Sequence, residues 1–71
     1  MKSFDEYKLR VGRAIHKRRT ALGLSLRDFG LMAGVHYNQL NRIERGLANP
    51  SLETLYKIAD ALDIDISNLL E

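Results

Sequence analysis

Residues 24–46 read LSLRDFGLMAGVHYNQLNRIERG, and this stretch decides the fold because it predicts two short helices that meet at Gly34. Apolar side chains at helical spacing give the first half a face that can be buried: Leu26, Phe29, Leu31, Met32 and Ala33. Ser25 stands just before this run and can cap the first helix. The glycine at position 34 can adopt the left-handed conformation that commonly ends a helix, so we predict a helix, a turn and a second helix.

The second half of this stretch separates an apolar edge from a hydrogen-bonding edge. Leu40 and Ile43 recur at a spacing of three, with Val35 ahead of them, and they predict the buried edge. Polar side chains fall away from that edge: Tyr37, Asn38, Asn41, Arg42 and Arg45. Gly30 lies inside the first helix, where glycine costs about 1 kcal/mol relative to alanine. We therefore expect close helix packing at Gly30, where a side chain would not fit.

This pattern resembles the helix-turn-helix of the lambda-repressor-like family of DNA-binding proteins, also called the Cro/cI or XRE family. In and before the motif, the matching residues are Gly12, Ile15, Arg19, Phe29, Gly30, Ala33, Gly34, Val35, Leu40, Ile43, Glu44 and Gly46. After it, they are residues 49–52, Leu55, Ile58, Ala59, Leu62, Ile64, Leu69 and Leu70. The resemblance covers nearly the whole chain. It implies a compact all-α fold of five helices, with the helix-turn-helix at the second and third.

The segment before the motif also reads as a helix. Residues 7–22 have an apolar inner side made of Val11, Ile15 and Leu22. Residues 1–6 lack a clear period, so we expect them to be frayed. Arg18 stands where family members often carry an apolar residue, so either the helix is rotated or the Arg18 stem covers the edge of the core.

The segment after the motif predicts two more helices. Pro50 cannot continue a helix and Ser51 can cap the next one, whose apolar stripe consists of Leu52, Leu55, Tyr56, Ile58, Ala59 and Leu62. A short last helix follows, with Ile66, Leu69 and Leu70. There is no linker, internal repeat or low-complexity segment, so we expect a single domain over residues 1–71 without strands.

Charge is divided unevenly along the chain. The net charge is +2, but residues 1–22 sum to +5, residues 23–50 to +1 and residues 51–71 to −4. A basic amino-terminal half suggests a polyanion such as nucleic acid as ligand, although short helices need charged faces in any case. Cysteine is absent, which excludes disulfides and thiolate metal sites. No apolar run is long enough to predict a membrane span, so we expect a cytoplasmic protein without membrane association.

Under the resemblance, the second helix of the motif enters a DNA major groove, where its amino-terminal residues reach base edges first. The candidate base readers are Tyr37, Asn38, Asn41 and Arg42. The Asn38 amide matches adenine and the Arg42 guanidinium matches guanine, and each bidentate contact contributes about 1–3 kcal/mol of base discrimination. The family's usual base readers match Tyr37, Asn38 and Arg42. The alternative is that all four are merely solvated helix residues.

Phosphate contacts are expected from groups that flank the recognition helix. The candidates are Arg10, Arg13, Lys17, Arg27, His36, Gln39, Arg45 and Asn49. The family usually has glutamine at the position of Leu26, where it supports a phosphate contact and the neighbouring base reader. Leucine cannot make that contact, but the free amide groups at the helix start can still meet a phosphate.

The resemblance gives Arg19 and Glu44 a structural role. In the family, an arginine and a glutamate at these positions pair inside the domain and tie the first helix to the recognition helix. If the pair is buried, removing either partner costs about 3–5 kcal/mol, because its mate is left uncompensated.

No group of residues points to catalysis or to a metal. His16 and His36 are far apart in the sequence and have no acids or cysteines at ligand spacing. The chain has no nucleophile elbow and no glycine-rich phosphate loop. We therefore expect no catalytic, cofactor-binding or metal-binding residues, and not an enzyme.

One recognition helix covers only a few base pairs, so we predict a homodimer on a near-palindromic operator with half-sites about 34 Å apart. The candidate dimer surface is Leu47, Ile64, Ile66, Leu69 and Leu70, and the alternative is that these residues simply close the core. The leading hypothesis is a transcription regulator, a repressor or autoregulator that binds a double-stranded DNA operator. Polymerase is a candidate protein partner. The alternative is an antitoxin or adaptor whose main partner is a protein such as a toxin.

Overall fold

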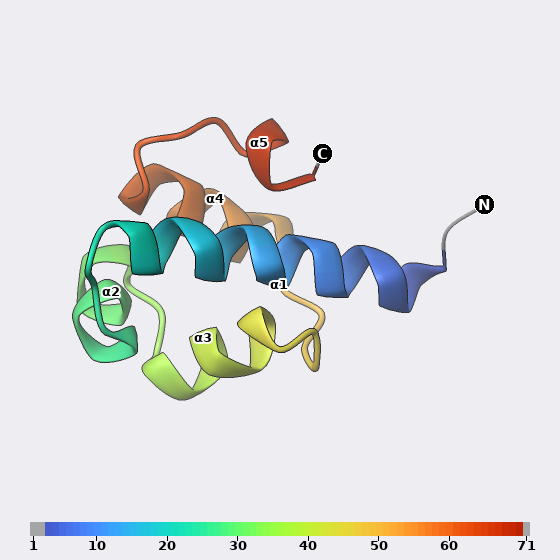
Figure 1. Cartoon of the computed structure of the whole chain (residues 1–71), viewed down its shortest axis with the longest axis horizontal. Helices are drawn as coiled ribbons and strands as arrows, with labels where there is room; N and C mark the ends of the chain where they lie inside the picture. Colours follow the sequence, from blue (N-terminus) through green and yellow to red (C-terminus); the bar gives the residue numbers. More distant parts are fainter. Residues whose placement is uncertain (1–2, 71) are drawn as a thin grey trace.

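Five helices make up residues 3–70, which are the residues that the structure, a computed structural model, describes (Figure 1). They are α1 (Phe4–Ala21), α2 (Leu26–Ala33), α3 (Tyr37–Glu44), α4 (Leu52–Ala61) and α5 (Ser67–Leu70). These residues contain no strand, so the predicted all-α fold with its helix-turn-helix at α2 and α3 is confirmed. The long helix α1 runs along the molecule, with α3 packed on one side of it and α5 on the other (Figure 1).

α1 begins earlier in the chain than the sequence pattern indicated. The Ser3 hydroxyl accepts a hydrogen bond from the Glu6 backbone N–H at 3.2 Å, and this cap sets the first helical residue at Phe4. The sequence pattern placed the start near Tyr7, and the local cap at Ser3 stabilises the earlier start, which has no apolar period. Residues 1–2 lie outside the described part of the chain.

The turn between α2 and α3 is built as the sequence predicts. The Ser25 hydroxyl accepts from the Asp28 N–H at 3.0 Å and caps α2. Gly34 ends the helix with φ 72°, in the left-handed region that favours glycine, and its N–H donates to the Gly30 carbonyl at 2.9 Å. The chain then turns sharply enough for α3 to pack against α2.

Two glycines allow backbones to approach closely. A Cβ on Gly30 would lie 2.6 Å from the Val35 carbonyl oxygen, so the close approach predicted there is confirmed, and its partner is the turn itself. A Cβ on Gly12 would lie 2.6 Å from the Glu44 carbonyl oxygen. The backbones of α1 and α3 therefore touch at Gly12, and this contact determines how far α3 stands from α1.

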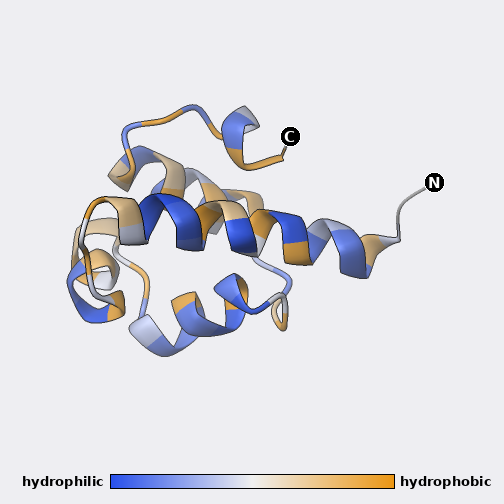
Figure 2. Ribbon diagram, viewed as in Figure 1, coloured by the Kyte–Doolittle hydropathy of each residue, from blue (hydrophilic) through white to orange (hydrophobic). Residues whose placement is uncertain are grey.

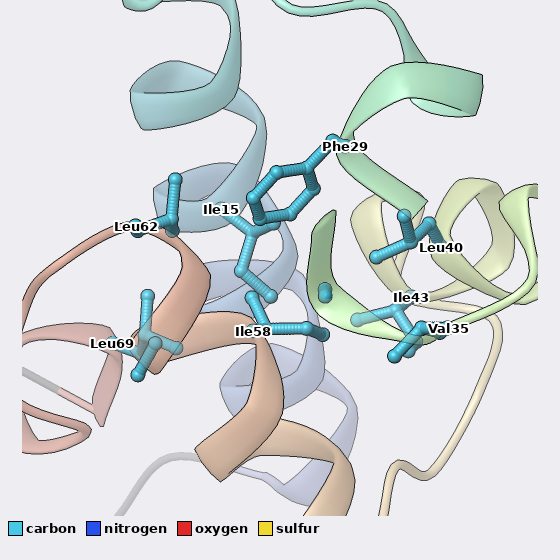
Figure 3. Packing of buried hydrophobic residues seen from close by; sticks show 10 residues of the cluster. Ile15, Phe29, Val35, Leu40, Ile43, Ile58, Leu62 and Leu69 are labelled. Atoms are coloured by element: carbon cyan, nitrogen blue, oxygen red, sulfur yellow. The ribbon is translucent and has the colours of Figure 1, made fainter. Parts of the chain in front are cut away.

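The core takes at least one large side chain from every helix. Figure 3 shows these side chains pointing toward a common centre: Ile15 from α1, Phe29 from α2, Leu40 and Ile43 from α3, Ile58 from α4 with Leu62 just after it, and Leu69 from α5. Burial of such side chains removes apolar surface from water and is the main force that stabilises the fold. Because α3 contributes two of these buried side chains, its position depends on how the whole core packs.

Several apolar side chains that were expected on buried faces are exposed instead: Leu22, Leu31, Met32, Leu52 and Tyr56. Leu31 is the extreme case, at 84% exposure. In a domain this small, each helix contacts its neighbours along a strip that is narrower than its apolar stripe, so side chains at the margin remain in water. Leu22, just past the last residue of α1, is among them. Arg18 is exposed too, so its guanidinium is in solvent.

Candidate nucleic-acid interface

α3 has one buried edge and one hydrogen-bonding edge. Leu40 and Ile43 are buried and hold the helix against α1 and α2. In Figure 2, hydrophilic residues cover the outer side of α3, where the chain is open to solvent. The residues predicted to read bases are accessible on this helix: Tyr37, Asn38, Asn41 and Arg42. Their side chains are therefore presented to a ligand from a backbone that the core holds in place.

α3 begins with a histidine in the cap position. The His36 Nδ1 accepts a hydrogen bond from the Asn38 backbone N–H at 3.1 Å, and the ring stacks on Tyr37 with centroids 4.6 Å apart. The sequence prediction gave His36 a phosphate contact and missed this cap, because the residues that usually cap helices are serine, threonine, aspartate and asparagine. With Nδ1 engaged, Nε2 is the ring nitrogen that remains for a ligand.

Arg27 and Tyr37 form a contact between the start of α2 and the start of α3. The Arg27 guanidinium carbon lies 4.1 Å from the centroid of the Tyr37 ring, and Arg27 Nη2 donates to the Tyr37 hydroxyl oxygen at 3.2 Å. Sequence reasoning assigned the two residues separately, one to phosphate and one to bases. Nothing in the linear pattern signals the pair, because it depends on the angle at which the helices cross.

Arg42 makes a contact within the chain. Its guanidinium donates to the Leu47 carbonyl oxygen at 3.0 Å, while its own carbonyl accepts from the Leu47 backbone N–H at 2.9 Å. Arg42 thus helps to close the turn after α3. A guanidinium has several N–H donors, so the remaining ones are still available to a base edge.

Arg19 and Glu44 are the main charged pair of the interior. Arg19 Nε donates to Glu44 Oε2 at 2.7 Å and Arg19 Nη2 to Glu44 Oε1 at 3.0 Å, and the side chains are only 10% and 5% exposed. Arg19 Nη1 also donates to the Leu24 carbonyl at 2.7 Å. The hydrogen bond to Glu44 raises the pKa of Arg19 above its ordinary value, and burial opposes this. The pair joins α1 to the end of α3, as the resemblance implied.

His16 is a third member of this cluster, and sequence reasoning did not assign it. Its Nδ1 lies 2.8 Å from Glu44 Oε1. Because a carboxylate only accepts hydrogen bonds, Nδ1 must carry the hydrogen, which makes Nε2 the free nitrogen of the neutral ring. The signal was available, since His16 precedes Arg19 by three positions and so shares its face of α1.

The residues predicted to contact phosphates do not form one cluster. All but one are exposed: Arg13, Lys17, Arg27, His36, Gln39, Arg45 and Asn49. Arg10 is half-buried, with its guanidinium carbon 5.9 Å from the Tyr7 ring centroid. Two smaller groups come together. Arg13 and Arg45 line an open hollow of about 400 Å³ beside Asn41, and Arg27 and His36 line a second one beside Tyr37.

The predicted dimer surface needs a correction. Leu69 is 1% exposed and belongs to the core, so it cannot contact a second copy. Ile64 and Ile66 are partly buried and pack against the same core. Only Leu47 and Leu70 are exposed. The short α5 turns its middle leucine inward, and this orientation was not evident from the sequence.

Two kinds of feature are missing from residues 3–70. No group of three or more histidine or acidic side chains is arranged to hold a metal ion in this range. None of its helices combines the length and the apolar character needed to cross a membrane.

A family model described as helix-turn-helix matches residues 15–69, which include α2, α3 and the flanking helices. The chain belongs to the helix-turn-helix family. Among curated relatives of this helix-turn-helix protein, the HTH-type transcriptional regulator SinR of Bacillus subtilis is 37% identical over 62 residues, which are 86% of this chain and 56% of SinR. The chain spans about half the length of the curated relatives it matches.

Solved structures agree with the helix-turn-helix assignment. The restriction-modification controller protein C.AhdI from Aeromonas hydrophila superposes with a TM-score of 0.84 and 34% identity, over 87% of this chain and 94% of its own. SinR, crystallised in complex with DNA, superposes with a TM-score of 0.81 and 37% identity, over 86% of this chain and 98% of its own. The predicted family is confirmed. These relatives are regulators from a non-enzymatic family, as predicted for this chain.

Proposed function

We propose that the protein is a transcription regulator that binds double-stranded DNA sequence-specifically, as a homodimer on a near-palindromic operator, and represses transcription there. The observation that carries this proposal is the accessible polar edge of α3, whose opposite edge is buried in the core. A regulator needs side chains held rigidly enough to recognise a base pattern, and a helix anchored in this way meets that need.

Asn38 and Arg42 are the proposed base readers. Asn38 is exposed in the first turn of α3, where side chains reach furthest into a groove, and its amide can pair with adenine. Arg42 lies one helical turn later and can pair with guanine while one of its N–H groups stays on the Leu47 carbonyl. Holding the guanidinium at that carbonyl limits the entropy lost on binding.

Phosphate contacts would set the register of the protein on the duplex. Arg13 and Arg45 line the hollow beside Asn41. Arg27 lines the second hollow, beside Tyr37, so positive charge lies next to both parts of the polar edge of α3 and can meet phosphates there. Acidic residues are concentrated instead in the carboxy-terminal segment 51–71, whose net charge is −4.

A salt titration with duplex DNA tests the proposal. Because each neutralised phosphate releases counterions, the logarithm of the binding constant should fall linearly with the logarithm of salt concentration, with a slope of about −0.9 per phosphate. Duplexes recovered from a random pool should share a motif with two-fold symmetry. Binding that is absent, or that does not change with salt, would show that the protein is not a DNA-binding regulator of this kind.

Two arginine variants separate base reading from positioning. Arg42→Ala should narrow the difference in affinity between the selected duplex and random DNA by about 1–3 kcal/mol. Arg45→Ala should weaken both about equally and reduce the salt slope by about 1. If Arg42→Ala also weakens both equally, Arg42 positions the protein and does not read a base.

A protein partner is the second candidate, and one observation favours it. An apolar hollow of about 270 Å³ opens between the first half of α1 and the loop before α4, and its lining includes Phe4, Tyr7, Val11, Pro50 and Leu55. An antitoxin or adaptor could seat another chain there. In that case a stoichiometric hetero-complex should purify from the native host and be lost in Tyr7→Asp, while affinity for the selected duplex is retained.

A further inference from the structure

Tyr37 is the residue whose surroundings differ most from those expected of a base reader. The guanidinium of Arg27 lies against its ring, and its hydroxyl oxygen already accepts a hydrogen bond from Arg27 Nη2 at 3.2 Å. The His36 ring stacks on it with an interplanar angle of 25°. A base reader needs a free edge or face, and most of this aromatic surface is already in use.

The charge of Arg27 has no ion-pair partner in the described part of the chain. Within residues 3–70, no carboxylate lies within ion-pair distance of its guanidinium, although Asp28 is the next residue. Arg27 is exposed, while Tyr37 is half-buried. An exposed arginine normally samples many rotamers, and contact with the tyrosine ring favours the one that lies between the starts of α2 and α3. The result is a fixed positive charge with free N–H donors.

We propose that Tyr37 is a positioning residue that holds the Arg27 guanidinium ready for one DNA phosphate, and that it does not read a base itself. This inference rests on the proposed DNA-binding function. The remaining N–H groups of Arg27 donate to the phosphate. The Tyr37 O–H, whose oxygen accepts from Arg27, still has its own hydrogen and donates it to the same phosphate. Two donors from two helices thus converge on one anion.

His36 makes this arrangement rigid. Its Nδ1 is held by the Asn38 N–H at 3.1 Å, so the ring cannot swing away without uncapping α3, and the ring in turn supports Tyr37. Leu26 is half-buried and packs on the core, so the first residue of α2 supplies no polar side chain to the phosphate. Arg27, one position later, supplies the contact because Tyr37 holds it in place.

The test compares Arg27→Ala, Tyr37→Leu, Tyr37→Phe and the double variant Arg27→Ala/Tyr37→Leu in duplex binding at several salt concentrations. Arg27→Ala should reduce the salt slope by about 1 and weaken selected and random duplexes equally. Tyr37→Leu should weaken both about two- to fivefold, and the loss in the double variant should be smaller than the sum of the two single losses. Tyr37→Phe keeps the ring face and should retain the salt slope. Tyr56→Leu, an exposed tyrosine on α4, is the matched control and should bind as wild type.

Two binding outcomes overturn the proposal. If Tyr37→Leu changes the preferred base at one position of the selected motif, Tyr37 reads that base. If the losses in the double variant are additive, the two residues act independently. The unfolding midpoint of each variant should remain near that of the wild type, because Tyr37 is outside the buried core.

A measurement on the free protein separates this inference from the proposed function. The Arg27 Nε–H resonance should be displaced by the ring current of Tyr37, and the displacement should persist in Tyr37→Phe and vanish in Tyr37→Leu. If it is absent in the wild type, the pairing is wrong, whatever the protein does with DNA. If it is present but the wild type shows no salt-dependent DNA binding, the proposed function fails, and the phosphate role of the pair fails with it.

Discussion

Glu44 is the residue on which the buried charges of this protein converge. Its carboxylate accepts from both Nε and Nη2 of Arg19, and it also lies 2.8 Å from His16 Nδ1. Glu44 is the last residue of α3, and both partners come from α1. A single carboxylate therefore ties the recognition helix to the longest helix, which makes the orientation of α3 sensitive to this one side chain.

We expect Arg19→Met and Glu44→Gln each to destabilise the fold by about 3–5 kcal/mol, because each leaves a buried charge without its partner. Urea unfolding followed by circular dichroism measures the loss. His16→Ala, which removes a half-exposed partner of the same carboxylate, should cost only about 0–1 kcal/mol. An equal loss in all three variants would contradict the assignment of the stabilisation to the buried pair.

At the scale of secondary-structure elements, the contact between α1 and α3 determines where the polar edge of α3 lies. The closest approach is at Gly12, where there is no room for a Cβ beside the Glu44 carbonyl. An interior helical glycine is otherwise unfavourable by about 1 kcal/mol relative to alanine. Close packing of the two helices offsets that loss.

Gly12→Ala is therefore expected to destabilise the domain by about 1–3 kcal/mol, the usual cost of overpacking, despite the higher helix propensity of alanine. Thermal unfolding gives the change directly. Arg18→Ala, on the exposed side of the same helix, is the control and should be near neutral. A Gly12→Ala variant as stable as the control would show that α3 can shift away from α1 without loss.

The start of α5 predicts a dependence of stability on pH. The Ser67 backbone N–H donates to Asp65 Oδ1 at 3.0 Å, and this bond, with that of the Ser67 hydroxyl, lowers the pKa of Asp65 below its ordinary value of 3.8. A carboxyl whose pKa is lower in the folded state contributes stability that is present above its unfolded pKa and lost as pH falls through the folded one. The contribution should therefore be complete at neutral pH.

Asp65→Ala should lower the unfolding midpoint near neutral pH, and the difference from wild type should shrink as the pH falls below the ordinary value of 3.8. Thermal unfolding over a pH series measures both. Asp60→Ala, on the exposed side of α4, provides the control for the loss of one negative charge. A difference from wild type that stays constant with pH would rule out the ionised carboxylate as its cause.

At the scale of the whole molecule, the proposed homodimer depends on surface that remains free after the core is complete. Leu47 and Leu70 are the candidate dimer residues that are exposed. Both are 50% exposed, which is compatible with partial burial by a second copy.

Leu70→Asp and Leu47→Asp should shift the protein toward monomer in sedimentation equilibrium without unfolding it, because a carboxylate in an apolar interface must be desolvated. Leu31→Asp, at 84% exposure on α2, should leave the association unchanged. Leu69→Asp is unsuitable, since that side chain is buried and its replacement would unfold the domain. Association that survives both interface variants would place the dimer surface elsewhere.

Sequence patterns predicted most of the fold and part of the candidate site. Leu40 and Ile43 at helical spacing, Ser25 as a cap and Gly34 as a stop were enough to place α2 and α3. The same reasoning put Leu31 on a buried face, because a stripe of apolar residues does not report how wide the contact with a neighbouring helix is. The periodicity was enough to predict that Asn38 and Arg42 are exposed. It did not predict which residues the side chains next to them contact.

By itself, the sequence determined the helices, their order, the turn at Gly34 and the family, because caps, periodicity and turn residues act over a few neighbouring positions. Helix packing in three dimensions sets the contact of Arg27 with Tyr37, the meeting of His16 and Arg19 at Glu44, and the inward orientation of Leu69. These contacts depend on the distances and angles between packed helices. Such geometry arises when all five helices share one core, so no local stretch of the chain encodes it.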